Sequence, residues 1–152
     1  LYGWNARDGE PERWPGWSHW TLWGRVFVGG EGKIYELVDG QHANGADIQR
    51  WLVRTGLLTK SNAIDMTEFR IMVERGSGTN TQAGDLLVRC SRDGRPYGPW
   101  LRKTIGKAGD RFQYMNFGSF GAASSFRFEI SSGDNFPFNI IKAEYRGYEI
   151  EV

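Results

Sequence analysis

Residues 85–100, DLLVRCSRDGRPYGPW, combine an apolar strand, a tight polar turn and an aromatic anchor. The apolar run in 85–90 predicts a strand. Serine and aspartate side chains bond to backbone amides within a turn, and glycine adopts positive φ without strain. The residues expected to build this structural turn are Ser91, Asp93, Gly94 and Trp100. We expect the Trp100 ring to stack over the turn and to cap the hairpin 86–105.

The composition agrees with a chain of short strands. Aromatic residues make up 14% of the 152 residues, and 21 glycines stand against 5 prolines. Aromatic residues favour strands and glycines favour tight turns, so this balance argues against a helical bundle. The length suits one compact domain or a piece of a larger repeat-built protein.

Most of the remaining segments alternate apolar and polar residues with a period of two. In 126–130, the side chains expected to point inward are those of Phe126, Phe128 and Ile130. The side chains of Arg127 and Glu129 are expected to point outward. Residues 24–38 indicate a hairpin around a glycine-rich turn, and in 66–74 the residues Phe69, Ile71 and Val73 share one face. Further strands are expected at 48–60, 111–117, 125–131 and 138–152, with a turn at 61–65. No segment sustains a helical period, so we predict an all-β fold of antiparallel β-sheets, propeller-blade-like or a β-sandwich.

Two regions differ in composition. Residues 1–23 form a Trp-rich N-terminal segment that is expected to pack on the sheet, and residues 24–152 form the antiparallel β domain. Trp17, Trp20 and Trp23 are spaced three apart, as on one face of a helix, but Pro15 and Gly16 precede them and the following run is strand-like. Extended aromatic packing is therefore the favoured interpretation.

The charge is nearly balanced. Nineteen Lys and Arg residues against eighteen Asp and Glu residues give a formal charge of +1, which excludes a globally basic nucleic-acid binder but leaves room for a local basic stripe.

No apolar run approaches the roughly 20 residues of a membrane helix, so no membrane span is expected. No signal peptide is recognised, and because the chain begins at Leu1 we expect a processed product or a fragment of a longer protein.

The sequence carries no signature of catalysis. Cys90 is the single cysteine, which excludes an intramolecular disulfide, and its apolar neighbours predict a buried side chain. His19 and His42 lack the spacing of metal ligands, no Gly-x-Ser-x-Gly motif occurs, and the carboxylates are scattered. We expect a protein that is not an enzyme and that uses no metal and no cofactor.

From Gly32 onward, a series of segments occurs in a suggestive order. They are 32–37 (GKIYEL), 48–55 (IQRWLVRT), 69–76 (FRIMVERG), 91–94 (SRDG) with Trp100, 106–109 (GKAG) before 111–112, and 126–131 (FRFEIS). In this order the chain resembles the C-terminal part of packaged-DNA stabilisation proteins, which are the tail hub or nozzle proteins of short-tailed bacteriophages. The turn departs from the family pattern Ser-x-Asp-Gly-Gly, because 95–99 stand between Gly94 and Trp100 and lengthen it.

The resemblance implies a β-propeller-like or β-rich subunit of the virion, repeated as a homo-oligomeric ring around the tail axis. The ring would form a channel that retains and passes the packaged DNA, with no catalytic residue. It further implies contacts with other tail proteins (adaptor, needle or fibre), transient contact with DNA, assembly in the host cytoplasm and a location in the virion tail. The candidate residues facing a DNA channel are Arg50, Arg54, Arg70 and Arg75. Alternatively, these arginines lie on ordinary strand faces and pair with Glu68 or Glu74 across strands.

A second hypothesis is a carbohydrate-binding β module on a virion or secreted protein. Exposed aromatic side chains with a polar rim are suited to stacking against sugars. The candidate residues for aromatic binding or for a subunit interface are Trp14, Trp17, Trp20 and Trp23, with Trp4, Trp51 and Trp100 as further platforms. A buried core is the alternative role for so many tryptophans.

Overall fold

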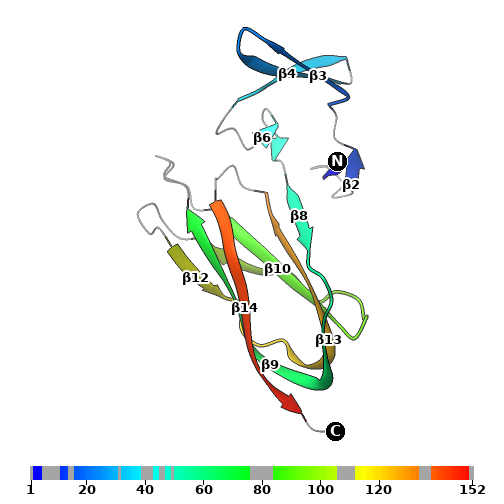
Figure 1. The fold of residues 1–152 in the computed structure, drawn as a ribbon, viewed down its shortest axis with the longest axis vertical. Coiled ribbons are helices and arrows are strands. Elements are labelled where there is room, and N and C mark those ends of the chain that lie inside the picture. The colour runs from blue at the N-terminus through cyan, green and yellow to red at the C-terminus, as the bar shows by residue number, and fades with distance from the viewer. Residues whose placement is uncertain are drawn as a thin grey trace. The chain divides into compact units, whose positions relative to one another are not determined.

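The computed structural model of the chain describes residues 2–4, 11–13, 16–30, 32–38, 43–44, 47–48, 50–75, 84–105, 112–133 and 138–150. Every regular element in these residues is a β-strand, and the strand pairs of known register are antiparallel (Figure 1). The predicted all-β class is thereby confirmed.

The contacts divide the chain into two units. The first comprises Leu1–Trp51 with Gly133–Asn135, and the second comprises Leu52–Ser132 with Phe136–Val152. The expected boundary between residues 23 and 24 falls instead inside a hairpin of the first unit, because β3 (Ser18–Leu22) pairs with β4 (Arg25–Gly30).

The first unit is built around the three-stranded antiparallel sheet β3-β4-β5, in which β5 is Lys33–Leu37. The predicted hairpin 24–38 is therefore present as β4 and β5. Trp23 and Gly24 connect β3 to β4 with φ values of 50° and 74°, the left-handed backbone that a two-residue hairpin turn requires. The short strands of this unit are β1 (Tyr2–Trp4) with β2 (Pro11–Arg13), and β6 (Ala43–Asn44) with β7 (Asp47–Ile48).

The second unit contains a seven-stranded sheet. Its strands are β8 (Trp51–Arg54), β9 (Leu58–Arg75), β10 (Asp85–Arg92), β11 (Leu101–Thr104), β12 (Phe112–Asn116), β13 (Gly121–Ser132) and β14 (Phe138–Ile150). The strand order is β11-β10-β13-β9-β12, with β14 on β9 and β8 on β13. The predicted hairpin 86–105 corresponds to β10 paired with β11.

This sheet folds over itself into two layers. Phe69 lies opposite Tyr145 in the register of β9 and β14, and Phe128 lies opposite Cys90 in the register of β13 and β10. The rings of Phe69 and Phe128 nevertheless stack at 4.1 Å between centroids, so they meet across layers. Strand β9 curves, and along one side it pairs first with β13 and then with β12, while along the other side it pairs with β14 from Ala63 to Arg75 (Figure 1). This arrangement is that of a sandwich, and the described strands form no propeller.

The core between the layers follows the predicted alternation. Phe69, Ile71 and Val73 of β9 are buried, as are Phe126, Phe128 and Ile130 of β13. Phe128 lies at the centre of an aromatic cluster, with Phe120 edge-on at 5.2 Å and Phe126 nearly parallel at 6.4 Å. Burial of these large apolar rings is the main source of stability in such a domain.

Two boundaries predicted from local sequence are wrong. The turn expected at 61–65 lies inside β9, because that stretch is hydrogen-bonded to β14 on one side and to β13 on the other. The strand expected over 48–60 is instead interrupted at 55–57. There the amide of Thr55 donates to the carbonyl of Phe128 at 2.9 Å, and its hydroxyl accepts from the Phe128 amide at 3.0 Å. Tertiary pairing thus overrides the local turn signal.

Candidate functional site

The turn at 91–94 has the predicted positive φ at Gly94, but the Asp93 side chain has other hydrogen-bond partners than expected. Asp93 and Gly94 have φ values of 49° and 70°. The Asp93 carboxylate accepts from the amides of Ser124 and Ser125, both at 2.9 Å, so it bonds to strand β13 rather than within its own turn. The Asp93 amide also donates to the Ser125 carbonyl at 3.0 Å. The turn therefore ties β10 to β13.

Replacing Asp93 by alanine is expected to lower the free energy of unfolding by roughly 1–2 kcal/mol, because two backbone amides lose a charged acceptor. Asparagine is the matched control, since it keeps an acceptor oxygen and tolerates left-handed φ. Urea denaturation should place Asp93→Asn between the wild type and Asp93→Ala. Equal losses in both variants would contradict the assigned bonds.

Trp100 contacts Arg89 of β10, and its stacking over the turn stays a prediction. Its ring lies beneath the Arg89 guanidinium, 4.3 Å from the ring centroid, and the same guanidinium lies 4.9 Å from the Tyr97 ring. The amide of Gly98 donates to the Cys90 carbonyl at 2.9 Å and holds this segment along β10. The extra residues after the turn thus bring two aromatic rings onto Arg89.

For Glu129, the exposure predicted from the alternating pattern is wrong. It was expected to point outward with Arg127, but its side chain is 0% exposed. Arg54 of β8 donates to its Oε1 from Nε at 2.8 Å and from Nη2 at 2.5 Å, and Arg89 of β10 donates to its Oε2 at 2.6 Å. Arg54 also lies over the Tyr97 ring at 5.6 Å. Because Arg54 and Arg89 reach Glu129 from the strands on either side of β13, and Tyr97 lies against both guanidinium groups, the alternating pattern could not reveal the burial.

The electrostatics of this cluster favour the charged pair. Burial by itself raises the pKa of Glu129, but the hydrogen bonds from Arg54 and Arg89 outweigh it and hold the pKa below its ordinary value. The bond to Glu129 likewise raises the pKa of Arg54. The cluster joins strands β8, β10 and β13 and is a structural clamp.

The arginines proposed for a DNA channel lie in different settings. Arg54 belongs to the Glu129 clamp, and Arg70 donates to Glu144 of β14 at 2.9 Å. Arg70 and Arg54 therefore pair with glutamates, although with other partners than the Glu68 and Glu74 of the alternative interpretation. Arg50 is partly buried and has interactions of its own. The side chain of Arg75 lies outside the described residues.

Charged side chains surround the Tyr114 ring on the outer face of β12, β9 and β14. Glu144 accepts from both Arg70 and Lys142, at 2.9 and 2.6 Å. The Tyr114 ring lies under both cations, at 4.9 Å from Arg70 and 5.6 Å from Lys142. The hydrogen bond from Lys142 lowers the pKa of Glu144. Arg70 and Lys142 therefore share one carboxylate partner on this face.

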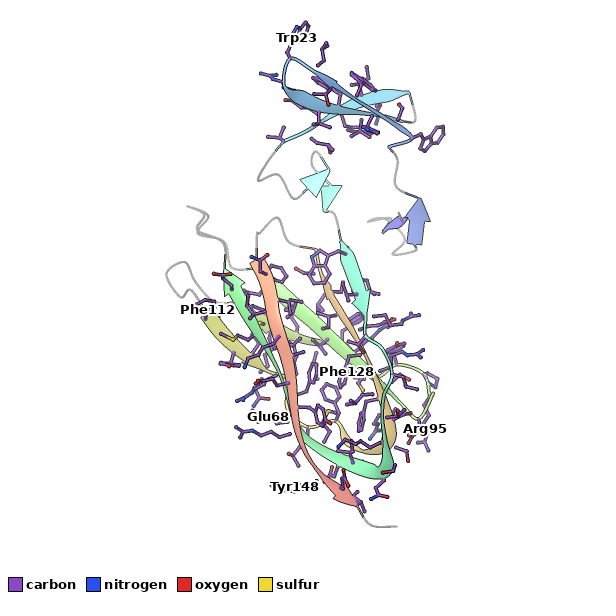
Figure 2. The ribbon with its side chains drawn as sticks, viewed as in Figure 1. Trp23, Glu68, Arg95, Phe112, Phe128 and Tyr148 are labelled. Atoms are coloured by element: carbon purple, nitrogen blue, oxygen red, sulfur yellow. The ribbon has the colours of Figure 1, made fainter. Side chains whose placement is uncertain are left out.

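The tryptophans on and beside β3 are exposed. Trp17 and Trp23 are exposed by 64% and 87%, and Trp20 by 37%. Trp23 stands at the tip of the β3–β4 hairpin (Figure 2). The side chain of Trp14 lies outside the described residues. Among the described side chains of this sheet, Val28 alone is buried.

Strand β14 forms an edge of the second unit. In the described residues it pairs only with β9, over Phe138 to Ile150. Its exposed apolar side chains include Ile140, Ile141, Tyr148 and Ile150. Tyr148 projects near the end of the strand (Figure 2).

Reactive groups are few in the part of the chain that the structure describes. Cys90 is buried, as predicted, and burial raises the pKa of its thiol to about 11. No group of three or more His, Cys, Asp or Glu side chains is placed to hold a metal ion among the described residues. His19 lies exposed on β3, and the side chain of His42 lies outside the described residues.

No protein-family model matches the chain, and no curated protein matches its sequence. Within the described residues, no helix is long and apolar enough to cross a membrane.

Proposed function

We propose that this chain is a structural subunit of a tail hub or nozzle of a short-tailed bacteriophage. In this role it self-associates into a ring in the virion tail, contacts neighbouring tail proteins, and helps to retain and pass the packaged DNA. The order of the segments from 32–37 to 126–131 supports the family assignment. We assign no catalytic residue.

The observation that carries this proposal is the edge of β14 that faces away from β9, which pairs with no other strand that the structure describes. An unpaired strand edge presents a row of backbone donors and acceptors to a neighbouring chain. This edge runs through Phe138–Ile150 and carries exposed isoleucine side chains. Burial of such apolar area against another copy would favour association.

The sheet also offers a geometry suited to a ring. Strands β12 and β14 flank β9 on opposite sides, so this layer has two different edges. A ring closes through head-to-tail contacts between two different surfaces of each subunit. Pairing of the β14 edge of one copy with the β12 side of the next meets that requirement.

The paired cations on the outer face of β12, β9 and β14 suit passage of DNA. Each of these cations lies against a carboxylate, because Arg70 and Lys142 share Glu144 and Arg146 lies 3.4 Å from Glu68. Strong phosphate binding requires uncompensated cations and gives a steep dependence on salt. Cations that are already paired with carboxylates attract DNA weakly, which allows the genome to slide.

The test is the native mass of the chain by light scattering over a concentration series. We expect a ring-sized species, and we expect Ile141→Lys or Tyr148→Lys to shift it toward the monomer because each places a charge at the β14 edge. The matched control is Ile34→Lys, an exposed isoleucine on β5 of the first unit. It should leave the mass unchanged.

Two results would overturn the proposal. One is a wild-type chain that stays monomeric at every concentration. The other is a ring that survives both β14 variants but dissociates in the Ile34→Lys control, which would move the interface to the first unit.

A further inference from the structure

Trp20 of β3 lies over a glycine of the neighbouring strand. A Cβ placed on Gly29 would stand 3.1 and 3.2 Å from Cζ3 and Cη2 of the Trp20 indole and 3.0 Å from Oγ of Ser18. The six-membered ring of the indole therefore occupies the space that any other residue at position 29 would fill. Trp20 remains 37% exposed, so part of the indole is open to solvent.

A polar pair lies on the same face of the sheet. In register, Trp20 is opposite Phe27 and Phe27 is opposite Glu36, which makes one row across β3, β4 and β5. The Trp20 and Phe27 rings are nearly parallel, with centroids 6.1 Å apart and planes inclined by 19°. Nε of Arg25 lies 3.6 Å from Oε1 of Glu36, and both side chains are accessible to solvent. We call these four residues the Trp20 face.

We propose that the Trp20 face binds a neutral oligosaccharide of two or more sugar rings. A sugar presents an apolar C–H side that packs on an aromatic ring and hydroxyl groups that bond to charged side chains. Trp20 and Phe27 supply the aromatic surface, and Glu36 and Arg25 supply an acceptor and a donor. The row spans two strand spacings, about 9–10 Å, which matches a ligand longer than one sugar ring.

The charges on this face favour a neutral sugar over a phosphate, a nucleic acid or an apolar protein surface. Arg25 and Glu36 compensate each other, so the face provides no excess positive charge for a phosphate or a nucleic acid. An apolar protein surface would cover the ion pair and remove its hydration, which disfavours binding. Hydroxyl groups can replace the lost water at both charged groups.

The experiment is calorimetric titration of the full chain with neutral malto-, cello- and chito-oligosaccharides of two to six rings. We expect at least one series to bind, and we expect Trp20→Ala to weaken that binding roughly tenfold or more, as for other buried aromatic anchors. Glu36→Gln keeps the size of the side chain and the aromatic surface, and it should weaken the same sugar to a smaller extent. Trp23→Ala is the matched control, because it removes an exposed indole at the hairpin tip, and it should bind like the wild type.

Circular dichroism of each variant checks that the sheet is intact. Failure of every series to bind would overturn the inference, as would binding that survives Trp20→Ala or is lost in Trp23→Ala. The titration is independent of the native mass, so a monomer that binds sugar would overturn only the ring, and a ring that binds none would overturn only this inference.

Discussion

Replacement of Glu129 by alanine is expected to lower the free energy of unfolding by about 2–3 kcal/mol, because the partly exposed Arg54 and Arg89 lose the carboxylate that accepts their charged hydrogen bonds. The loss is large since Glu129 is fully buried and accepts from β8 and β10 at once. Urea denaturation followed by circular dichroism measures the change.

The control is another glutamate that pairs at the surface. Glu149 lies 3.3 Å from Lys60, and both side chains are about half exposed. Glu149→Ala should change the free energy of unfolding by no more than about 1 kcal/mol. If Glu129→Ala were as stable as Glu149→Ala, the clamp would have no structural role.

The same clamp makes the fold sensitive to acid. Because the folded-state pKa of Glu129 is lowered, the stability that it contributes is fully present above the carboxyl pKa of the unfolded chain, about 4.3. That stability is lost as the pH falls through the folded-state pKa. Between about pH 4.3 and the folded-state pKa, the free energy of unfolding should fall more steeply for the wild type than for Glu129→Gln, which has no proton to bind.

Replacement of Phe128 by alanine is expected to lower the free energy of unfolding by about 3–5 kcal/mol. Phe128 contacts three other phenylalanine rings between the two layers, so its removal leaves a cavity that rigid neighbours cannot fill. Figure 2 shows Phe128 inside the second unit and Phe112 on strand β12. Thermal or urea unfolding reports the difference.

Phe112 is the matched control, because it is the same residue type in the same unit but is about half exposed. Phe112→Ala should cost less than about 1 kcal/mol. A loss of stability in Phe112→Ala equal to that in Phe128→Ala would show that the aromatic cluster is not the centre of the core.

Local patterns were sufficient for the class of the fold and for several elements. The alternation in 126–130 predicted the buried faces of Phe126, Phe128 and Ile130, and Asp93 with Gly94 predicted a turn with positive φ. These features depend on side-chain period and backbone freedom, which neighbours in sequence control. The open edge of β14, by contrast, could be seen only once its single pairing with β9 was known.

The alternation, glycine and aromatic content of the chain determine an all-β fold with hairpins at 24–38 and 86–105, because strand period and turn conformation are local properties. Tertiary structure alone decided that 61–65 continues a strand, since hydrogen bonds from β13 and β14 outweigh turn propensity there. It also decided that Glu129 is buried, because Arg54 and Arg89 reach it from segments 75 and 40 residues away. These distant arginines replace water around the Glu129 carboxylate, and the residues next to Glu129 in sequence do not indicate that they lie there.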